Sequence, residues 1–175
     1  MKKLLLSVLL ASGSLLSSGS FAAQPEVNAP VTASAGYGPV IIWPAKFTPG
    51  TTDNFVSNKV VVKGLTINDV WPFLTHANEW PSYYKNSANI HFYKQGETEL
   101  HQGTRFKFTT FGFPVESRVT EYQPSVNGSP ARLAWDGWVV GDAQHRLDVH
   151  HAWLLENLPG GRLLIQTEES QIGVP

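Results

Sequence analysis

The chain contains no cysteine among its 175 residues. This absence excludes disulfide bonds, thiol catalysis and thiolate metal ligands. It also excludes a lipid anchor attached to an N-terminal cysteine. Because 42% of the residues are hydrophobic, the composition is that of a globular protein whose fold depends on packing alone.

Charged residues are also few, at 15% of the chain, and the formal net charge is −1. No run of basic residues occurs beyond the N-terminus, which argues against nucleic acid as a partner. The glycine pairs near positions 36–38 and 160–161 do not precede a helix with the Lys and Ser/Thr of a phosphate-binding loop. The Gly-x-Ser-x-Gly pattern of a serine hydrolase is missing as well. We therefore expect no cofactor.

Several potential metal ligands lie close together near position 148. On a β-strand His150 and His151 point to opposite faces, so they cannot share one ion. Asp148 shares a face with His150, but two ligands are too few for zinc. The sequence therefore predicts no metal site.

The N-terminus has the pattern of a cleavable signal peptide. Lys2 and Lys3 precede an apolar run over residues 4–16, and Ser20 and Ala22 supply small side chains before a cut. The pattern predicts a signal peptide over residues 1–22, cleaved after Ala22 or, alternatively, Ala23. The apolar run is shorter than the roughly 20 residues that cross a bilayer, so we expect no integral membrane anchor after processing. The predicted location is periplasmic or secreted.

The remaining chain is predicted to hold a flexible linker over residues 23–38 and one domain over residues 39–175. Residues 39–54 are expected to lie along the domain surface as an extended strap. A strand over 55–64 precedes a short helix that begins after Thr66, an N-cap residue, with Pro72 expected in its first turn. A second short helix is predicted over 79–85. Six strands follow, over 88–94, 104–111, 114–122, 131–140, 146–157 and 162–171.

This order predicts an α+β fold, in which two short helices follow the first of about seven strands and the later strands form a meander. No strand–helix–strand repeat occurs, which excludes a doubly wound nucleotide-binding sheet. A three-residue turn over 159–161 would place Leu155 opposite Ile165 and His151 opposite Glu169. That register keeps the apolar side chains of both strands on one face.

The pair His151 and Glu169 is the best candidate for general acid–base catalysis, because a carboxylate partner tunes the protonation of an imidazole. The alternative is a structural pair that satisfies two polar groups. The chain also has six Trp and nine Phe residues. Aromatic side chains combine an apolar body with, in Trp and Tyr, one polar tip, which suits an amphipathic ligand. The residues predicted to line a ligand cavity are Trp80, Tyr83, Phe106, Phe108, Trp135, His151 and Trp153.

Four stretches together carry a resemblance to a known superfamily. They are residues 70–74 with 80–87, residues 110–119, residues 151–156, and residues 160–161 leading to 167–170. They resemble the SRPBCC superfamily, also called START-like or polyketide cyclase/dehydrase-like. The resemblance implies a helix-grip fold, in which a curved antiparallel sheet wraps a long C-terminal helix around an apolar cavity. It also implies binding of lipids, sterols, polyketides or other hydrophobic molecules.

One departure from that resemblance concerns the C-terminus, where no helical pattern follows the last strand. We therefore expect the long helix to be missing, with the open grip covered by a second copy, a partner or the N-terminal segment. The leading functional interpretation is an exported binding protein for a hydrophobic small molecule or lipid. The alternatives are a cyclase or dehydratase that uses His151 and Glu169, and a truncated form completed by another chain.

Overall fold

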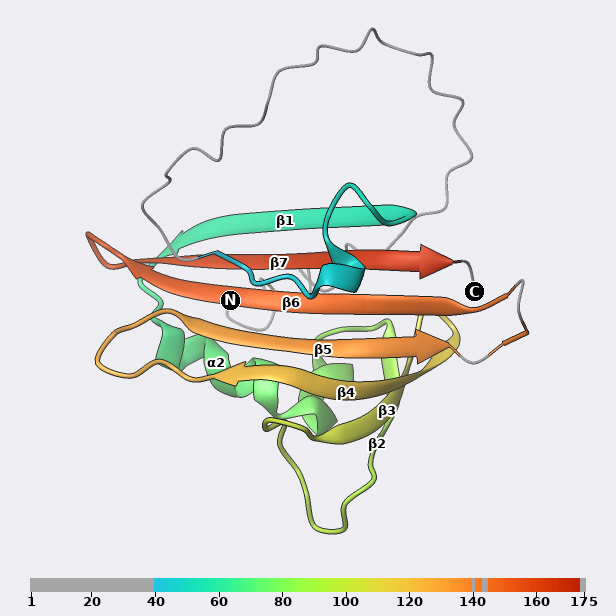
Figure 1. Cartoon of the computed structure of the whole chain (residues 1–175). Coiled ribbons are helices and arrows are strands. Elements are labelled where there is room, and N and C mark those ends of the chain that lie inside the picture. The colour runs from blue at the N-terminus through green and yellow to red at the C-terminus, as the bar shows by residue number, and fades with distance from the viewer. Residues whose placement is uncertain (1–39, 140, 143–144, 174–175) are drawn as a thin grey trace, which may run out of the picture.

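The computed structural model describes residues 40–139, 141–142 and 145–173. The predicted signal peptide and linker lie outside these residues. Seven antiparallel strands form one sheet in the order β1-β7-β6-β5-β4-β3-β2 (Figure 1). The strands are β1 Asn54–Lys63, β2 Ser87–Phe92, β3 Arg105–Thr110, β4 Phe113–Gln123, β5 Ala131–Val139, β6 Leu147–Leu158 and β7 Arg162–Gly173. The predicted meander of six strands is confirmed, and β1 joins it at the edge beside β7.

Helix α2, Ile67–Thr75, begins as predicted after Thr66. The Asp69 carboxylate accepts a hydrogen bond from the Thr66 backbone N–H at 3.0 Å, which satisfies a donor at the helix start. Pro72 lies in the second turn and not in the first, so that part of the prediction is wrong. The helix still ends after nine residues.

The second predicted helix is shorter than expected and is a 3-10 turn, η2, over Ala77–Ser82. It ends because Tyr83, with a φ of −139°, has left the helical region. Within the described residues, no helix is long and apolar enough to cross a membrane.

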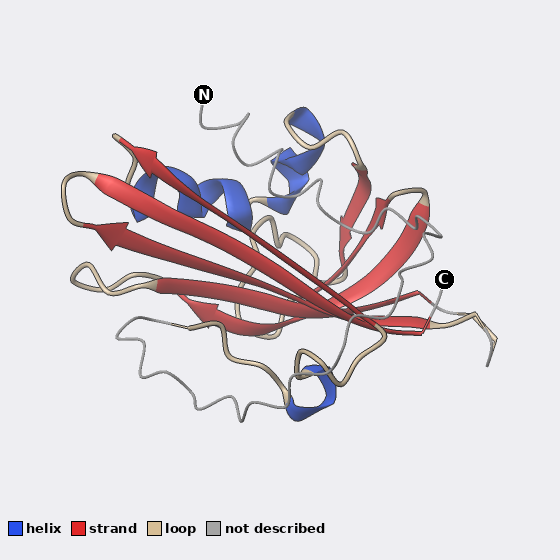
Figure 2. Cartoon of the chain, turned by 90° about the horizontal axis from the view of Figure 1, so that it is seen from above, coloured by secondary structure: helices blue, strands red, loops and turns tan. Residues whose placement is uncertain are grey.

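The two faces of the sheet are covered by different segments (Figure 2). We call the face under α2 and η2 the inner face, and the opposite face the outer face. The main core lies on the inner face, where Ile67, Val70 and Leu74 of α2 pack against the aromatic and aliphatic side chains of β3 to β7. Burying this continuous apolar face is the main force that holds the helices on the sheet.

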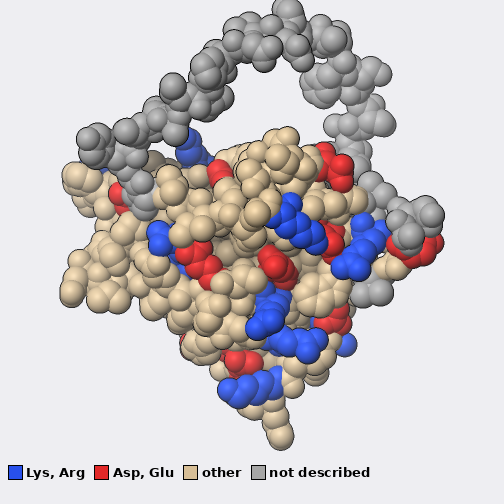
Figure 3. Space-filling model, in the orientation of Figure 1, with Lys and Arg blue, Asp and Glu red and all other residues tan. Residues whose placement is uncertain are grey.

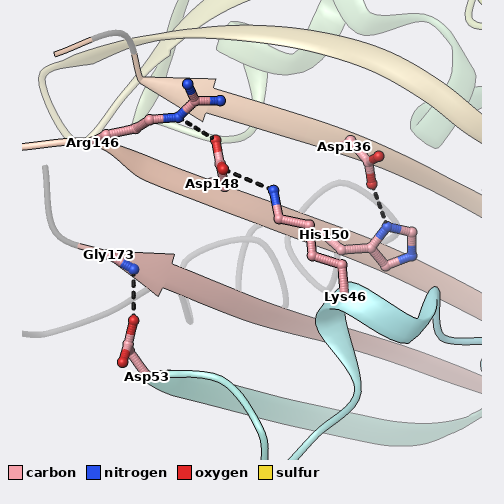
Figure 4. A network of polar contacts seen from close by, with 7 residues as sticks. All are labelled: Lys46, Asp53, Asp136, Arg146, Asp148, His150 and Gly173. Carbon is pink, nitrogen blue, oxygen red and sulfur yellow. Dashed lines mark hydrogen bonds and ion pairs between the residues drawn. The ribbon is translucent and has the colours of Figure 1, made fainter. Parts of the chain in front are cut away.

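Residues 40–53, here called the strap, lie on the outer face and include the 3-10 turn η1, Ala45–Phe47. Ile41 and Trp43 pack against small and aliphatic side chains of β5 and β6. Lys46 Nζ lies 2.8 Å from the Asp148 carboxylate, as Figure 4 shows. The described part of the N-terminal segment therefore covers the outer face. The expectation that this segment fills the open inner side of the sheet is not met by these residues.

Candidate functional site

A histidine–glutamate pair lies on the inner face of strands β6 and β7. The strands pair so that His151 is opposite Glu169 and Leu155 is opposite Ile165, as the three-residue turn predicts. His151 Nδ1 lies 2.7 Å from Glu169 Oε2. The predicted cross-strand contact is therefore present, and its catalytic role stays a prediction.

The pair belongs to a longer series of polar side chains that we call the inner polar row: Asn54, Gln171, Glu169, His151 and Thr167. Asn54 donates to the Gln171 side-chain oxygen at 2.8 Å, and Gln171 donates to the second Glu169 oxygen. A carboxylate accepts but does not donate, so His151 Nδ1 carries the proton shared with Glu169. In the neutral imidazole, Nε2 then accepts from the Thr167 hydroxyl, 3.0 Å away.

Two groups have a shifted pKa: Glu169, which belongs to the inner polar row, and Tyr84, which is influenced by the charge of Glu169. Burial raises the pKa of Glu169, but the hydrogen bond and charge of His151 and the hydrogen bond of Gln171 lower it more strongly. The result is a pKa below the ordinary value, so Glu169 is ionised at neutral pH. Burial, together with the Glu169 charge, raises the pKa of Tyr84, which keeps that phenol protonated.

Aromatic rings enclose the imidazole of the row. Trp135 stacks on His151 with ring centroids 4.7 Å apart and planes 13° apart, and Trp153 lies 5.6 Å away. Trp80, from η2, packs on Trp135 and on Phe108 at 5.6 and 5.5 Å. The inner face thus joins a dense aromatic cluster to a polar row.

The structure brings the predicted aromatic residues together, but mainly as a core. All six are buried: Trp80, Tyr83, Phe106, Phe108, Trp135 and Trp153. The Tyr83 hydroxyl donates to the Phe73 backbone carbonyl and its ring packs edge-on against Phe73, on the helix side of the core. The role of these residues in binding a ligand stays a prediction.

Three buried polar atoms on the inner face of the described chain have no hydrogen-bond partner: Nε1 of Trp153, Oγ of Ser117 and Oγ of Ser87. Trp153 and Ser117 are each 1% exposed and Ser87 is 3% exposed. Ser117 is paired with Gly137, where an added Cβ would lie 3.0 Å from Val115 and from Val149. A buried donor without an acceptor is costly to a fold, so such atoms mark places where a ligand could supply the partner.

Sequence reasoning did not assign three members of the inner polar row to the site. Thr167 and Gln171 lie two residues on either side of Glu169, so strand alternation alone places all three on one face. That signal was available in the sequence. The position of Asn54 was not, because it depends on β1 pairing with β7 and not with its neighbours along the chain.

Potential metal ligands do not gather in the part of the chain that the structure describes. No group of three or more His, Asp or Glu side chains there could hold an ion. His150 and His151 point to opposite faces, and His150 Nδ1 lies 2.7 Å from Asp136 on the outer face.

The solved structures that resemble this chain include one strong and one distant likeness. No family model and no curated protein matches the chain. The crystal structure of the hypothetical protein jhp0584 from Helicobacter pylori shares 49% identity, covers 81% of this chain and 83% of that one, and has a TM-score of 0.76. Truncated norcoclaurine synthase from Thalictrum flavum shares 11% identity over 69% of this chain and 76% of that one, with a TM-score of 0.50.

The distant likeness concerns the fold alone. Together with the seven-stranded curved sheet and its two short helices, it confirms the predicted α+β, helix-grip fold class. The high identity to the bacterial protein extends over most of both chains. The chain therefore belongs to the same family as the hypothetical protein jhp0584 of Helicobacter pylori.

Proposed function

We propose that the chain is an exported member of the SRPBCC superfamily that binds a hydrophobic small molecule or lipid at the inner face of its sheet. The helix-grip fold and the likeness to norcoclaurine synthase support the superfamily assignment. Folds of this type place ligands in the space between the curved sheet and the helices that cover it.

The observation that carries this proposal is the buried N–H of Trp153. Its indole is only 1% exposed and lies beside the inner polar row, yet Nε1 has no acceptor among the described residues. Binding sites for amphipathic molecules combine apolar walls with a small number of placed polar groups. A ligand with an apolar body and one acceptor oxygen would contact the aromatic cluster and accept the Trp153 hydrogen bond.

The test compares two tryptophans that lie on opposite faces of the sheet. We would measure binding of cis-parinaric acid, a fluorescent fatty acid, to the wild type, to Trp153→Phe and to Trp138→Phe. Trp138 is half-buried on the outer face, so its variant is the matched control. Loss of one hydrogen bond should weaken binding by about fivefold in Trp153→Phe, with no change in Trp138→Phe.

Two results would contradict the proposal. One is a wild type that binds no fatty acid and carries no hydrophobic molecule detectable by native mass spectrometry. The other is an equal loss of affinity in both variants, which would place the ligand elsewhere.

A second candidate function is a cyclase or dehydratase activity that uses His151 and Glu169. The carboxylate fixes the proton on His151 Nδ1, and Thr167 holds Nε2, so the imidazole has a defined orientation for proton transfer. In an enzyme, His151→Ala would abolish turnover with a far smaller loss of fatty-acid affinity, whereas in a carrier only the affinity would change, because His151 is predicted to line the cavity. The ratio of these two effects, measured on the same preparation, separates the two functions.

Export is part of the same proposal. The N-terminal pattern supports cleavage after Ala22 or Ala23, with release into the periplasm or medium. Intact-mass analysis of protein from an osmotic-shock fraction would show a chain that begins at residue 23 or 24. A full-length chain in the cytosol would contradict export. The expected homo-oligomer or covering partner stays a prediction.

A further inference from the structure

The outer face of strands β3 and β4 carries a group of cationic side chains that take no part in the site proposed on the inner face. Arg105 and Arg118 are directly opposite each other in the β3–β4 register, and both are exposed. Like charges in that position are destabilising, because their Cβ atoms lie only about 4.5–5.5 Å apart. Neither guanidinium forms an ion pair or hydrogen bond with any residue that the structure describes.

Two ammonium groups extend the positive charge around this arginine pair. Lys107 Nζ lies 5.9 Å from the centre of the Tyr93 ring, and the Arg105 guanidinium carbon lies 5.2 Å from it. Lys94 follows Tyr93 directly and is exposed. Figure 3 shows several Lys and Arg side chains in the lower part of this face, with Asp and Glu side chains among them. We call Lys94, Arg105, Lys107 and Arg118 the outer cationic group.

A cleft opens beside this group. It has a volume of about 400 Å³ and is lined by residues 93–94, 97 and 102–105, which include Tyr93, Lys94 and Arg105. The rest of its wall is formed by Glu97, Gln102, Gly103 and Thr104. A cleft of this size holds a small molecule, and the ring supplies a surface for an apolar or sugar-like body.

The carboxylates nearest the outer cationic group are already engaged by other side chains. Both oxygens of Glu116 accept from the Tyr93 hydroxyl, at 2.7 and 2.6 Å. Glu97 accepts from the Thr104 hydroxyl at 2.9 Å, and Asp136 binds His150. The carboxylates keep their charge, and in the strand registers Glu116 is opposite Lys107 and Asp136 is opposite Arg118. None of the three carboxylates forms an ion pair with the four cations in the described chain, so they reduce the local positive charge but leave an excess of one cation for an external anion.

We propose that the outer cationic group and its cleft form a binding site for a phosphate monoester group. Guanidinium forks bind phosphate oxygens in pairs, and a phosphate monoester carries nearly two negative charges at about pH 7, which suits two opposed arginines with two lysines beside them. The ligand is a soluble phosphorylated small molecule or a phosphomonoester lipid headgroup. The site is separate from the inner face and does not depend on the function proposed for it.

The chain offers a matched control for the arginine pair. Lys63 and Arg162 are also opposed cations, on β1 and β7, and both are exposed. They lie at the other edge of the sheet, away from the cleft and from Tyr93. A variant in which both become glutamine changes the net charge by the same amount as Arg105→Gln with Arg118→Gln.

The experiment uses two probes on the whole chain at low ionic strength. Inorganic phosphate is titrated by calorimetry, and vesicles of phosphatidylcholine with or without phosphatidic acid are tested by co-sedimentation. We expect the wild type to bind phosphate and the Arg105→Gln/Arg118→Gln variant to bind it at least about tenfold more weakly. Lys63→Gln/Arg162→Gln should bind like the wild type. Arginine-dependent binding only to vesicles with phosphatidic acid would assign the site to a lipid headgroup.

Two further readouts exclude a loss of folding and a general charge effect. The arginine variant should unfold at the same or a higher temperature than the wild type, because a like-charge pair has been removed. Phosphate affinity should fall as salt is added. The proposal is overturned if the wild type binds neither probe, or if the control variant loses as much affinity as the arginine variant.

Discussion

Two neighbouring histidines show how differently the two faces of this sheet are built. His150 and His151 follow each other on β6, and each lies 2.7 Å from one carboxylate oxygen. His150 is paired with Asp136 under the strap, between the rings of Trp43 and Phe47. His151 is paired with Glu169 on the inner face.

The two histidine–carboxylate pairs differ mainly in how far their carboxylates are exposed to water. The Asp136 side chain is 39% exposed, whereas that of Glu169 is 19% exposed. Water can therefore replace His150 as the partner of Asp136, but it replaces His151 poorly. The outer pair lies under the strap, whereas the inner pair fixes the position of a charge and of a proton on the inner face.

The largest effect should come from removing one histidine at a time. His151→Ala leaves a buried carboxylate without its main partner and should lower the free energy of unfolding by about 3 kcal/mol. His150→Ala leaves a hydrated carboxylate, and the strap can settle into the space, so we expect a loss of about 2 kcal/mol. Urea denaturation of both variants measures the difference. A larger loss in His150→Ala would reverse the comparison.

The next largest effect should be a difference between the two faces in the pH at which their carboxylates stop stabilising the fold. The pKa of Glu169 lies below its ordinary value of 4.5, so its stabilising contribution is present above about pH 4.5 and is lost as the pH falls through the lower folded pKa. Burial raises the pKa of Asp148, but hydrogen bonds from Lys46 and Arg146 leave it below 3.8. Its contribution is therefore lost at lower pH than 3.8.

Unfolding free energies measured from pH 6 downward, in steps of about half a unit, would test this order. Glu169→Gln should flatten the profile below about pH 4.5, and Asp148→Asn should flatten only its most acidic part. An unchanged slope in Glu169→Gln would show that the inner pair does not carry the acid sensitivity.

The smallest effect should come from the ion pair between the strap and β6. The Lys46 side chain is 55% exposed, so its contact with Asp148 is well screened by water. Lys46→Met should cost about 0.5 kcal/mol at low salt, and the difference from the wild type should shrink as sodium chloride is added. A loss that is independent of salt would indicate that the lysine stem, and not its charge, holds the strap.

Local patterns predicted much of the fold and part of the inner face. The turn over 159–161 and the alternation of β6 and β7 were enough to place His151 opposite Glu169. The boundaries of η2 were missed, because Tyr83 leaves the helical region to insert into the core. The likeness to a superfamily supplied the expectation of a grip, which the seven-stranded sheet confirms.

Strand alternation by itself determined that His150 and His151 act on different faces, since successive side chains of a strand point to opposite sides. Tertiary structure alone decided which segment covers each face and which distant residues meet. Beyond Lys2 and Lys3 the sequence contains no run of basic residues, yet β3 and β4 bring Arg105 and Arg118 together although they are 13 positions apart along the chain. Pairing between strands, and not sequence proximity, sets the charge density of a sheet surface.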